Sequence, residues 1–172
     1  NLIQRIKMNK VIKGRVWVLG EDTDTDVIYP GKYLPILDPV EMAKHALEGY
    51  DPEFPSKLKE GDIIVAGPGF GIGSSREQAA TCLKAAGLAA IVAGSFARIF
   101  FRNAVNQGLP TVQADISDKL KDGDEISIDF DKCLISFPGG QVEFPPLDES
   151  VQKIIEAGGL IPAVRSKLGI KD

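Results

Sequence analysis

The residues best suited to chemistry in this sequence lie in one glycine-rich stretch, Gly67–Gln78. Glycine at every second position from 67 to 73 permits a tight backbone that brings main-chain amides close to a ligand. Ser74, Ser75 and Arg76 follow where a helix is expected to begin, and helix N-termini attract anions. Because a guanidinium binds a carboxylate or phosphate through two parallel hydrogen bonds, the stretch predicts an anion-binding loop.

Two common phosphate-binding motifs do not match this loop. Its glycine spacing differs from the Gly-x-Gly-x-x-Gly fingerprint, and a Walker loop needs Lys before Ser or Thr, where this sequence has Ser-Ser-Arg. A simple strand-to-helix turn, with Ser74 or Ser75 as the N-cap, is the structural alternative. Arg76 and a second hydroxyl exceed what a cap needs, so the pattern favours a binding loop.

Two further polar segments are candidates for function. Asp22, Asp24 and Asp26 alternate with threonines, but the glycine and the terminal glutamate of a calcium loop are missing, so a solvated turn is the alternative. Arg98 and Arg102 lie four positions apart on a predicted helix and hence on one face. Solvent or an ion pair is the common explanation for such arginines, with an anionic ligand as the other.

The remaining nucleophilic and metal-binding residue types give little support to other chemistries. His45 is the only histidine and is expected in mid-helix, in a surface or packing role, so a serine triad is not indicated. Cys82 and Cys133 are too few for a zinc or iron–sulfur site, so no metal is assigned to this chain. We expect Cys82 in a buried helix, Cys133 in a strand and no disulfide, which fits a reducing cytoplasm.

Composition and charge narrow the class of protein. The chain has 172 residues, 44% of them hydrophobic, and a formal net charge of −4. An acidic chain lacks the basic surface of a nucleic-acid-binding protein, and no apolar run approaches the roughly 20 residues of a membrane span. We therefore expect neither a nucleic-acid nor a membrane partner. Residues 1–9 are interpreted as an N-terminal extension or a remnant of expression, and residues 10–172 as a single domain.

Hydrophobic patterning predicts the elements that must position these motifs. Strands are expected at Gly14–Gly20, Ile63–Ala66 and Ala89–Ala93 and from Gly108, and helices at Asp38–Gly49, Glu77–Ala86 and Ser95–Asn106. A short extended segment is expected at 27–29 and a linker over 50–60. Strand, helix and strand in succession favour parallel pairing.

The pattern changes after Asp122-Gly123. Alternating residues at 125–130, 133–137 and 141–144 predict an antiparallel meander, and residues 149–157 predict a closing amphipathic helix. The order of elements indicates a mixed α/β domain with flanking helices, not a regular doubly wound sheet.

Three motifs occur in order along the chain: Asp-Thr-Asp-x-Ile-x-Pro-Gly at 24–31, Gly-x-Gly-Ser-Ser-Arg-Glu at 71–77, and Ser-Phe-Ala-Arg-Ile-Phe-x-Arg-Asn at 95–103. Through them the sequence from Lys10 onward resembles the small subunits of 3-isopropylmalate dehydratase, in the aconitase superfamily, in their short archaeal-type form. The resemblance implies a swivelling β/β/α domain like the fourth domain of aconitase. It also implies a hydro-lyase that interconverts 2- and 3-isopropylmalate in leucine biosynthesis.

The resemblance further implies a partner and a cofactor. A separate, cysteine-bearing large subunit would carry a [4Fe-4S] cluster whose open iron binds the hydroxyl and a carboxylate of a small dicarboxylate substrate. This chain would complete the active site. Within it, Ser74 corresponds to the general base, while Gly73, Ser75 and Arg76 bind substrate carboxylate. Because serine is a poor base, amides, cations and the helix N-terminus must stabilise its alkoxide.

Asp26, together with Thr25, matches the family's active-site aspartate. Substrate choice is expected in the segment after Pro30-Gly31, at Tyr33, Leu34, Pro35 and Ile36. Relatives that accept a distal carboxylate, such as homoaconitase, tend to carry an arginine after the Tyr-Leu pair, where this chain has proline. An apolar lining suits an isopropyl or methyl group and leaves a third carboxylate without a counter-ion. We expect 3-isopropylmalate as substrate, with a citramalate, dimethylmalate or homoaconitate dehydratase, a non-catalytic anion-binding module, or a serine hydrolase as alternatives.

Overall fold

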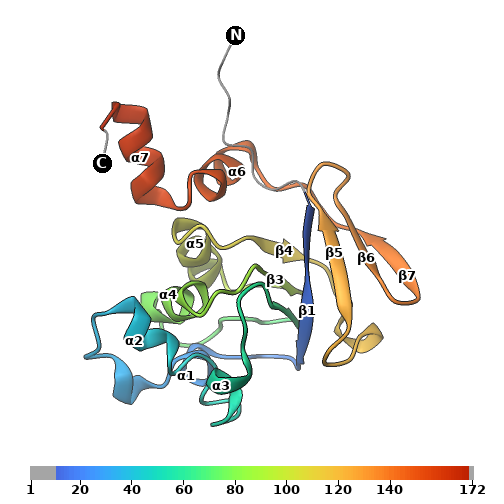
Figure 1. The fold of residues 1–172 in the computed structure, drawn as a ribbon, viewed down its shortest axis with the longest axis horizontal. Coiled ribbons are helices and arrows are strands. Elements are labelled where there is room, and N and C mark those ends of the chain that lie inside the picture. The colour runs from blue at the N-terminus through green and yellow to red at the C-terminus, as the bar shows by residue number, and fades with distance from the viewer. Residues whose placement is uncertain (1–10, 171–172) are drawn as a thin grey trace.

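The described residues of the computed structural model, 11–170, contain a seven-stranded mixed sheet (Figure 1). Its strand order is β4-β3-β2-β1-β5-β6-β7. The strands are β1 Val11–Leu19, β2 Ile63–Ala66, β3 Ala90–Ala93, β4 Thr111–Gln113, β5 Glu125–Asp129, β6 Leu134–Phe137 and β7 Gly140–Glu143. The prediction for residues 1–9 lies outside the described residues.

Strands β1 to β4 form the parallel half of the sheet, and β5 to β7 form the antiparallel half. Val18 pairs with Val65, and Val65 with Val92, so the predicted strand–helix–strand unit is confirmed. The predicted meander is confirmed as well, and it joins the parallel half through antiparallel pairing of β1 with β5. The mixed α/β architecture predicted from the sequence is correct.

Helices cover the parallel half, with α2, α4 and α5 side by side to one side of β1 in Figure 1. Two single-turn 3₁₀ helices occupy Gly31–Tyr33 and Ser117–Lys119. The α-helices are α1 Thr25–Ile28, α2 Pro39–Ala43, α3 Phe54–Lys57, α4 Glu77–Ala85, α5 Arg98–Asn106, α6 Glu149–Glu156 and α7 Leu160–Leu168. Among the described residues, no helix combines the length and the apolar character needed to cross a membrane.

Several predicted boundaries are wrong, each for a local reason. The segment expected to extend at 27–29 instead begins as the helical turn α1, because the Asp24 carboxylate accepts hydrogen bonds from the Asp26 and Val27 amides. The helix expected to reach Gly49 ends at Ala43 and continues as turns in which Leu47 has a φ of +59°. The predicted linker contains α3, and α7 is an additional helix.

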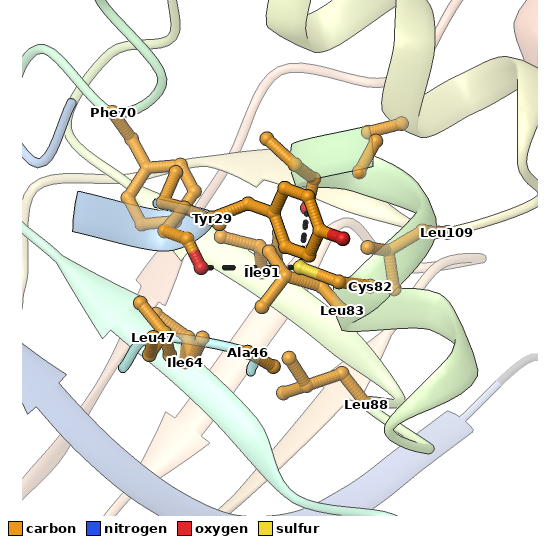
Figure 2. Close-up of a cluster of buried hydrophobic side chains, with 14 of the residues drawn as sticks. Tyr29, Ala46, Leu47, Ile64, Phe70, Cys82, Leu83, Leu88, Ile91 and Leu109 are labelled. Atoms are coloured by element: carbon orange, nitrogen blue, oxygen red, sulfur yellow. Dashed lines mark hydrogen bonds between the residues drawn. The ribbon is translucent and has the colours of Figure 1, made fainter. Parts of the chain in front are cut away.

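Two apolar layers pack on opposite faces of the sheet, as alternate strand residues require. Ile64 and Ala66 belong to the helix-covered layer, whereas Ile63 and Val65 belong to the other. Figure 2 shows the helix-covered layer, with Tyr29 and Cys82 among its buried side chains.

The two cysteines lie in different settings. The Cys82 sulfur lies 3.2 Å from the Ala79 carbonyl oxygen inside α4, so its predicted packing role is confirmed. Burial raises the pKa of the Cys82 thiol far above its ordinary range. Cys133 lies in the turn before β6 with a φ of +52°, not in the strand as predicted, because Asp129 accepts hydrogen bonds from the amides of that turn.

Candidate active site

The glycine-rich loop leaves the carboxyl end of β2 and bends through residues with positive φ. Gly69 and Gly71 have φ values of +81° and +83°. A Cβ on Gly71 would lie 2.3 Å from Cγ of Phe100, so glycine is required there for space as well as for conformation. Phe70, between these glycines, is fully buried and packs edge-on against Phe100 at 5.2 Å between ring centroids. The loop therefore has an apolar anchor on α5.

Main-chain hydrogen bonds bring the three sequence motifs together. The amide of Thr25 donates to the carbonyl of Ile72 at 2.9 Å, which joins the Asp-Thr-Asp segment to the glycine loop. The amide of Ala97 donates to the carbonyl of Phe70, also at 2.9 Å, which joins that loop to the start of α5. These segments follow β1, β2 and β3, whose carboxyl ends meet at one edge of the sheet, the usual ligand-binding edge of parallel α/β sheets.

A cavity of about 270 Å³ opens at this junction. Its polar wall combines hydroxyl groups, guanidinium groups and one side-chain amide, and its apolar wall comes from the first turn of α5. The lining residues are Thr25, Gly71, Gly73, Ser74, Ser75, Arg76, Ala97, Arg98, Ile99, Phe100 and Asn103. No carboxylate lines it among the described residues. Such a cavity suits an anion with an apolar substituent.

Arg76 is held beside the cavity by an ion pair with Asp26. Nη1 of Arg76 lies 2.6 Å from Oδ1 of Asp26 and also donates to the carbonyl of Tyr29 at 3.1 Å. The same Asp26 oxygen accepts a hydrogen bond of 2.9 Å from the Gly31 amide. The Arg76 hydrogen bond, followed by that of Gly31, holds the pKa of the Asp26 carboxyl below its ordinary value. Only 17% of the Arg76 side chain is exposed, so the guanidinium is fixed in position.

Neither serine caps α4, although the sequence allowed that interpretation. The N-cap residue is Arg76, in extended backbone, and no side chain makes a cap hydrogen bond there. Ser74 and Ser75 are exposed at the cavity, and neither hydroxyl has a hydrogen-bond partner within residues 11–170. The Ser74 carbonyl accepts a hydrogen bond of 2.7 Å from the Thr25 hydroxyl, which fixes the backbone but leaves Oγ of Ser74 available.

The segment expected to choose the substrate lies beside the cavity and does not line it. It begins next to the ion pair, since a Cβ on Gly31 would lie 3.3 Å from Nη2 of Arg76. Tyr33 is half-buried, Leu34 and Pro35 are exposed, and Ile36 packs against the helix-covered core. Contact of these four residues with a substrate stays a prediction.

An aromatic stack holds this segment in place. The rings of Tyr33 and His45 are 3.6 Å apart and nearly parallel, and both side chains hydrogen-bond to Glu48, at 2.5 and 2.6 Å. The Glu48 hydrogen bond raises the pKa of the Tyr33 phenol. His45 thus packs, as expected, although it lies in a turn after α2 and not inside a helix.

Arg98 and Asn103 are the polar cavity residues that the sequence did not assign. Both lie in the third motif, and Arg98 follows the buried strand β3 by a few residues. The position of Arg98 shortly after β3 was a signal available in the sequence, because the loops that follow neighbouring parallel strands lie at the same edge of the sheet. Arg102, predicted on the same helix face, does not line the cavity.

The residues of this chain do not fit an iron–sulfur cluster. Within residues 11–170, no three Cys, His, Asp or Glu side chains gather in a way that could hold a metal ion. Cys82 is a buried residue of α4 in the helix-covered core, and Cys133 lies in the antiparallel half of the molecule. Neither cysteine lines the cavity.

Comparison with known proteins gives consistent matches. The family described as the aconitase C-terminal domain matches residues 24–116. The 3-isopropylmalate dehydratase small subunit 1 of Methanopyrus kandleri is 50% identical over 161 residues, covering 92% of this chain and 95% of that protein. The methanogen homoaconitase small subunit of Methanothermobacter thermautotrophicus is 49% identical over 156 residues, covering 90% and 91%. The crystal structure of 3-isopropylmalate dehydratase from Methanocaldococcus jannaschii superposes with a TM-score of 0.89 at 46% identity, covering 93% and 96%.

Proposed function

Because the chain belongs to the small subunits of 3-isopropylmalate dehydratase, in the aconitase superfamily, we propose that its cavity is half of that enzyme's active site. The activity is the interconversion of 2- and 3-isopropylmalate by removal and return of water, in leucine biosynthesis. A large subunit is the implied partner, and we propose that it is the subunit that carries the [4Fe-4S] cluster. The described residues of this chain do not fit an iron–sulfur cluster, so the roles proposed for them do not include holding one.

The convergence of Ser74, Ser75 and Arg76 on one cavity carries this proposal. Oγ of Ser74 is the atom that takes the carbon-bound proton. Serine is a poor base at its ordinary pKa, so positive groups must stabilise the alkoxide. The N-terminus of α4 and the Arg76 guanidinium, both within the same turn of chain, supply that stabilisation.

Asp26 and Arg76 act together in binding. Asp26 is a positioning residue, because its contact with Arg76 fixes the orientation of the guanidinium while leaving Nη2 without a protein hydrogen bond among the described residues. Ser75 and Arg76 then bind one carboxylate of the substrate. Ala97, Ile99 and Phe100 form an apolar wall suited to an isopropyl group.

Isopropylmalate is the substrate that these features favour. A homoaconitate dehydratase must bind a third carboxylate, and the segment 33–36 offers no cation for it. Citramalate and dimethylmalate are the alternatives, because one methylene group changes binding by only about 1–3 kcal/mol. We place the protein in the cytoplasm, and the free thiols of Cys82 and Cys133 support a reducing compartment.

Anaerobic reconstitution with the large subunit and iron tests the proposal. The complex is assayed on isopropylmalate, citramalate, dimethylmalate and homoaconitate, and we expect the highest kcat/KM for isopropylmalate. The chain alone should be inactive, and turnover without the large subunit would contradict the subunit assignment.

A serine-to-alanine pair tests the proposed base. Ser74→Ala should lower kcat by about 10²–10⁴, the usual contribution of a general base, while the complex still assembles by size-exclusion chromatography. Ser150→Ala, at an exposed position of α6, serves as the matched control with unchanged kcat. Full activity of Ser74→Ala would remove Ser74 from the base role.

A further inference from the structure

The Glu48 carboxylate lies in the turn after α2, and both of its oxygens have partners within the chain. Oε1 accepts a hydrogen bond of 2.5 Å from the Tyr33 phenol, and Oε2 lies 2.6 Å from Nδ1 of His45. The rings of these two partners are stacked, and only 23% of the Glu48 side chain is exposed. Because a largely buried carboxylate is costly unless it is hydrogen-bonded, these two contacts are needed to hold it there.

The backbone on both sides of Glu48 is fixed to the helical turn α1. On one side, the Leu47 amide donates to the Ile28 carbonyl at 2.7 Å, and the Leu47 side chain is fully buried in the layer that Figure 2 shows. On the other side, the Gly49 amide donates to the Val27 carbonyl at 3.1 Å, and a Cβ on Gly49 would lie 2.7 Å from Cα of Val27. The turn and α1 therefore form one unit, which gives Glu48 a fixed position.

The segment that starts at Gly31 is attached to this unit at two points. The Gly31 amide donates to Oδ1 of Asp26 in α1, the oxygen that also binds Arg76. Two residues later, the Tyr33 phenol donates to Glu48. The first attachment joins the segment to the ion pair beside the cavity, and the second holds the part of the segment that leads away from it. The place of the segment relative to the guanidinium therefore depends on both.

We propose that Glu48 is a positioning residue for substrate choice. The inference rests on the proposed function and deepens it, since Arg76 there binds a substrate carboxylate and the neighbouring segment meets the substituent. Leu34 and Pro35 follow Tyr33 directly and are exposed beside the cavity. When Glu48 holds Tyr33, these two residues keep a defined place relative to the bound carboxylate. That place sets the size of substituent that fits, because small displacements in a site have large effects on rate.

The ratio of kcat/KM for isopropylmalate to kcat/KM for citramalate, which has a methyl group in place of the isopropyl group, tests the inference in the reconstituted enzyme. The ratio does not depend on how much of the enzyme is folded or assembled, so a merely structural role would not change it. Glu48→Ala should lower the ratio by about tenfold, the lower end of the discrimination that one methylene group gives. Glu41→Ala, which removes an exposed carboxylate of α2 that pairs with Lys44, is the matched control and should keep the wild-type ratio.

Two milder variants keep the test decisive if Glu48→Ala does not fold. Glu48→Gln retains an oxygen that can accept from the Tyr33 phenol, so it should keep most of the ratio. Tyr33→Phe retains the ring that stacks on His45 and should lower the ratio about threefold, the effect of one hydrogen bond. Tyr50→Phe, at an exposed tyrosine that packs on another ring, is its control. Because Glu48→Ala and Tyr33→Phe break the same hydrogen bond, the double variant should lose no more than Glu48→Ala alone.

The outcomes separate failure of the inference from failure of the proposed function. If the wild type is active and the ratio is unchanged in Glu48→Ala, or in Tyr33→Phe where the first variant does not fold, the inference is overturned and the proposed function stands. An equal fall of the ratio in Glu41→Ala also overturns the inference, because the effect would not be specific to the contact with Tyr33. A wild-type complex that turns over none of the dehydratase substrates rejects the proposed function, and the inference with it.

Discussion

Oδ1 of Asp26 lies 2.6 Å from Nη1 of Arg76, although 50 positions separate the two residues in the sequence. The contact joins the first motif to the glycine loop through side chains, beside the main-chain bonds that already connect them. It also orients the guanidinium at this part of the cavity, because the carboxylate holds Nη1 of Arg76. Changes at either residue should therefore alter binding and catalysis more than folding.

Replacing Asp26 by Asn should lower kcat/KM of the reconstituted enzyme by about 10–100-fold, the usual effect of losing a positioning partner. Arg76 keeps its bond to the Tyr29 carbonyl but loses its carboxylate. The Asp26 side chain is 66% exposed, so the urea midpoint of unfolding should change little. Asp51→Asn, which removes an exposed ion pair with Lys57 away from the cavity, is the matched control. Equal activity losses in both variants would argue against a special role for Asp26.

The Asp26 carboxyl should titrate below the ordinary aspartate pKa of about 3.9. A carboxyl whose pKa is lower in the folded chain stabilises the fold above its unfolded pKa, and this contribution is lost as pH falls through the folded pKa. The ion pair should thus persist throughout the neutral range and open only in acid.

NMR titration of the carboxyl carbons in the wild type and in Arg76→Gln measures the effect. Because Arg76 is the main cause of the lowered pKa, the Asp26 midpoint should rise in the variant. The Asp51 midpoint, lowered by the Glu53 amide and Lys57, should stay the same and serves as the internal reference. An Asp26 midpoint that does not move in Arg76→Gln would contradict the contact.

Gly71→Ala should destabilise the fold by about 1–3 kcal/mol more than Gly123→Ala, as expected for overpacking. Both glycines have positive φ, at +83° and +92°, so the backbone strain is similar. Only at Gly71 would the new Cβ meet the Phe100 ring, while nothing lies within 4 Å at Gly123. Urea unfolding of both variants isolates the steric effect, and equal losses would show that Phe100 moves aside freely.

Pro35→Arg should raise the ratio of kcat/KM for homoaconitate to that for isopropylmalate by at least about tenfold, since a guanidinium there could pair with the distal carboxylate. Pro35 is exposed in a segment held by the Tyr33–His45 stack, so the substitution should leave the fold intact. Pro52→Arg, also exposed but outside the cavity lining, is the control. An unchanged ratio would leave the segment 33–36 without a role in substrate choice.

Strongly patterned segments were predictable from sequence, whereas segments that depend on the local use of one side chain or one proline were not. The buried runs Ile63–Ala66 and Ala90–Ala93 with the helix between them could be recognised because burial on both faces gives continuous apolar runs. The turn at Thr25–Ile28 could not, since it depends on how the Asp24 side chain is used. The sequence did not predict α7, because two glycines followed shortly by Pro162 indicate the end of a helix. Proline is nevertheless tolerated in the first turn of a helix, where amides lack helical partners.

The place of the candidate site along the chain was predictable, but the full set of residues that line its cavity was not. Ser74, Ser75 and Arg76 combine residue types that suit anion binding, and the cavity contains all three. Arg98 lines the cavity and Arg102 does not, and the sequence could not separate these two arginines because it does not reveal how the first turn of α5 meets the glycine loop. The resemblance to a known family supplied the proposed base, which residue types alone do not identify.

The joints between the three loops consist of main-chain atoms, as in the bonds from Thr25 to Ile72 and from Ala97 to Phe70. Such joints do not depend on which side chains the neighbouring positions carry. The chain can therefore exchange residues in the segment 33–36 without rebuilding the architecture that holds Ser74. Adaptation to a new malate derivative is then a matter of few substitutions, and enzymes that divide these substrates among themselves can descend from one ancestor with little loss of foldability.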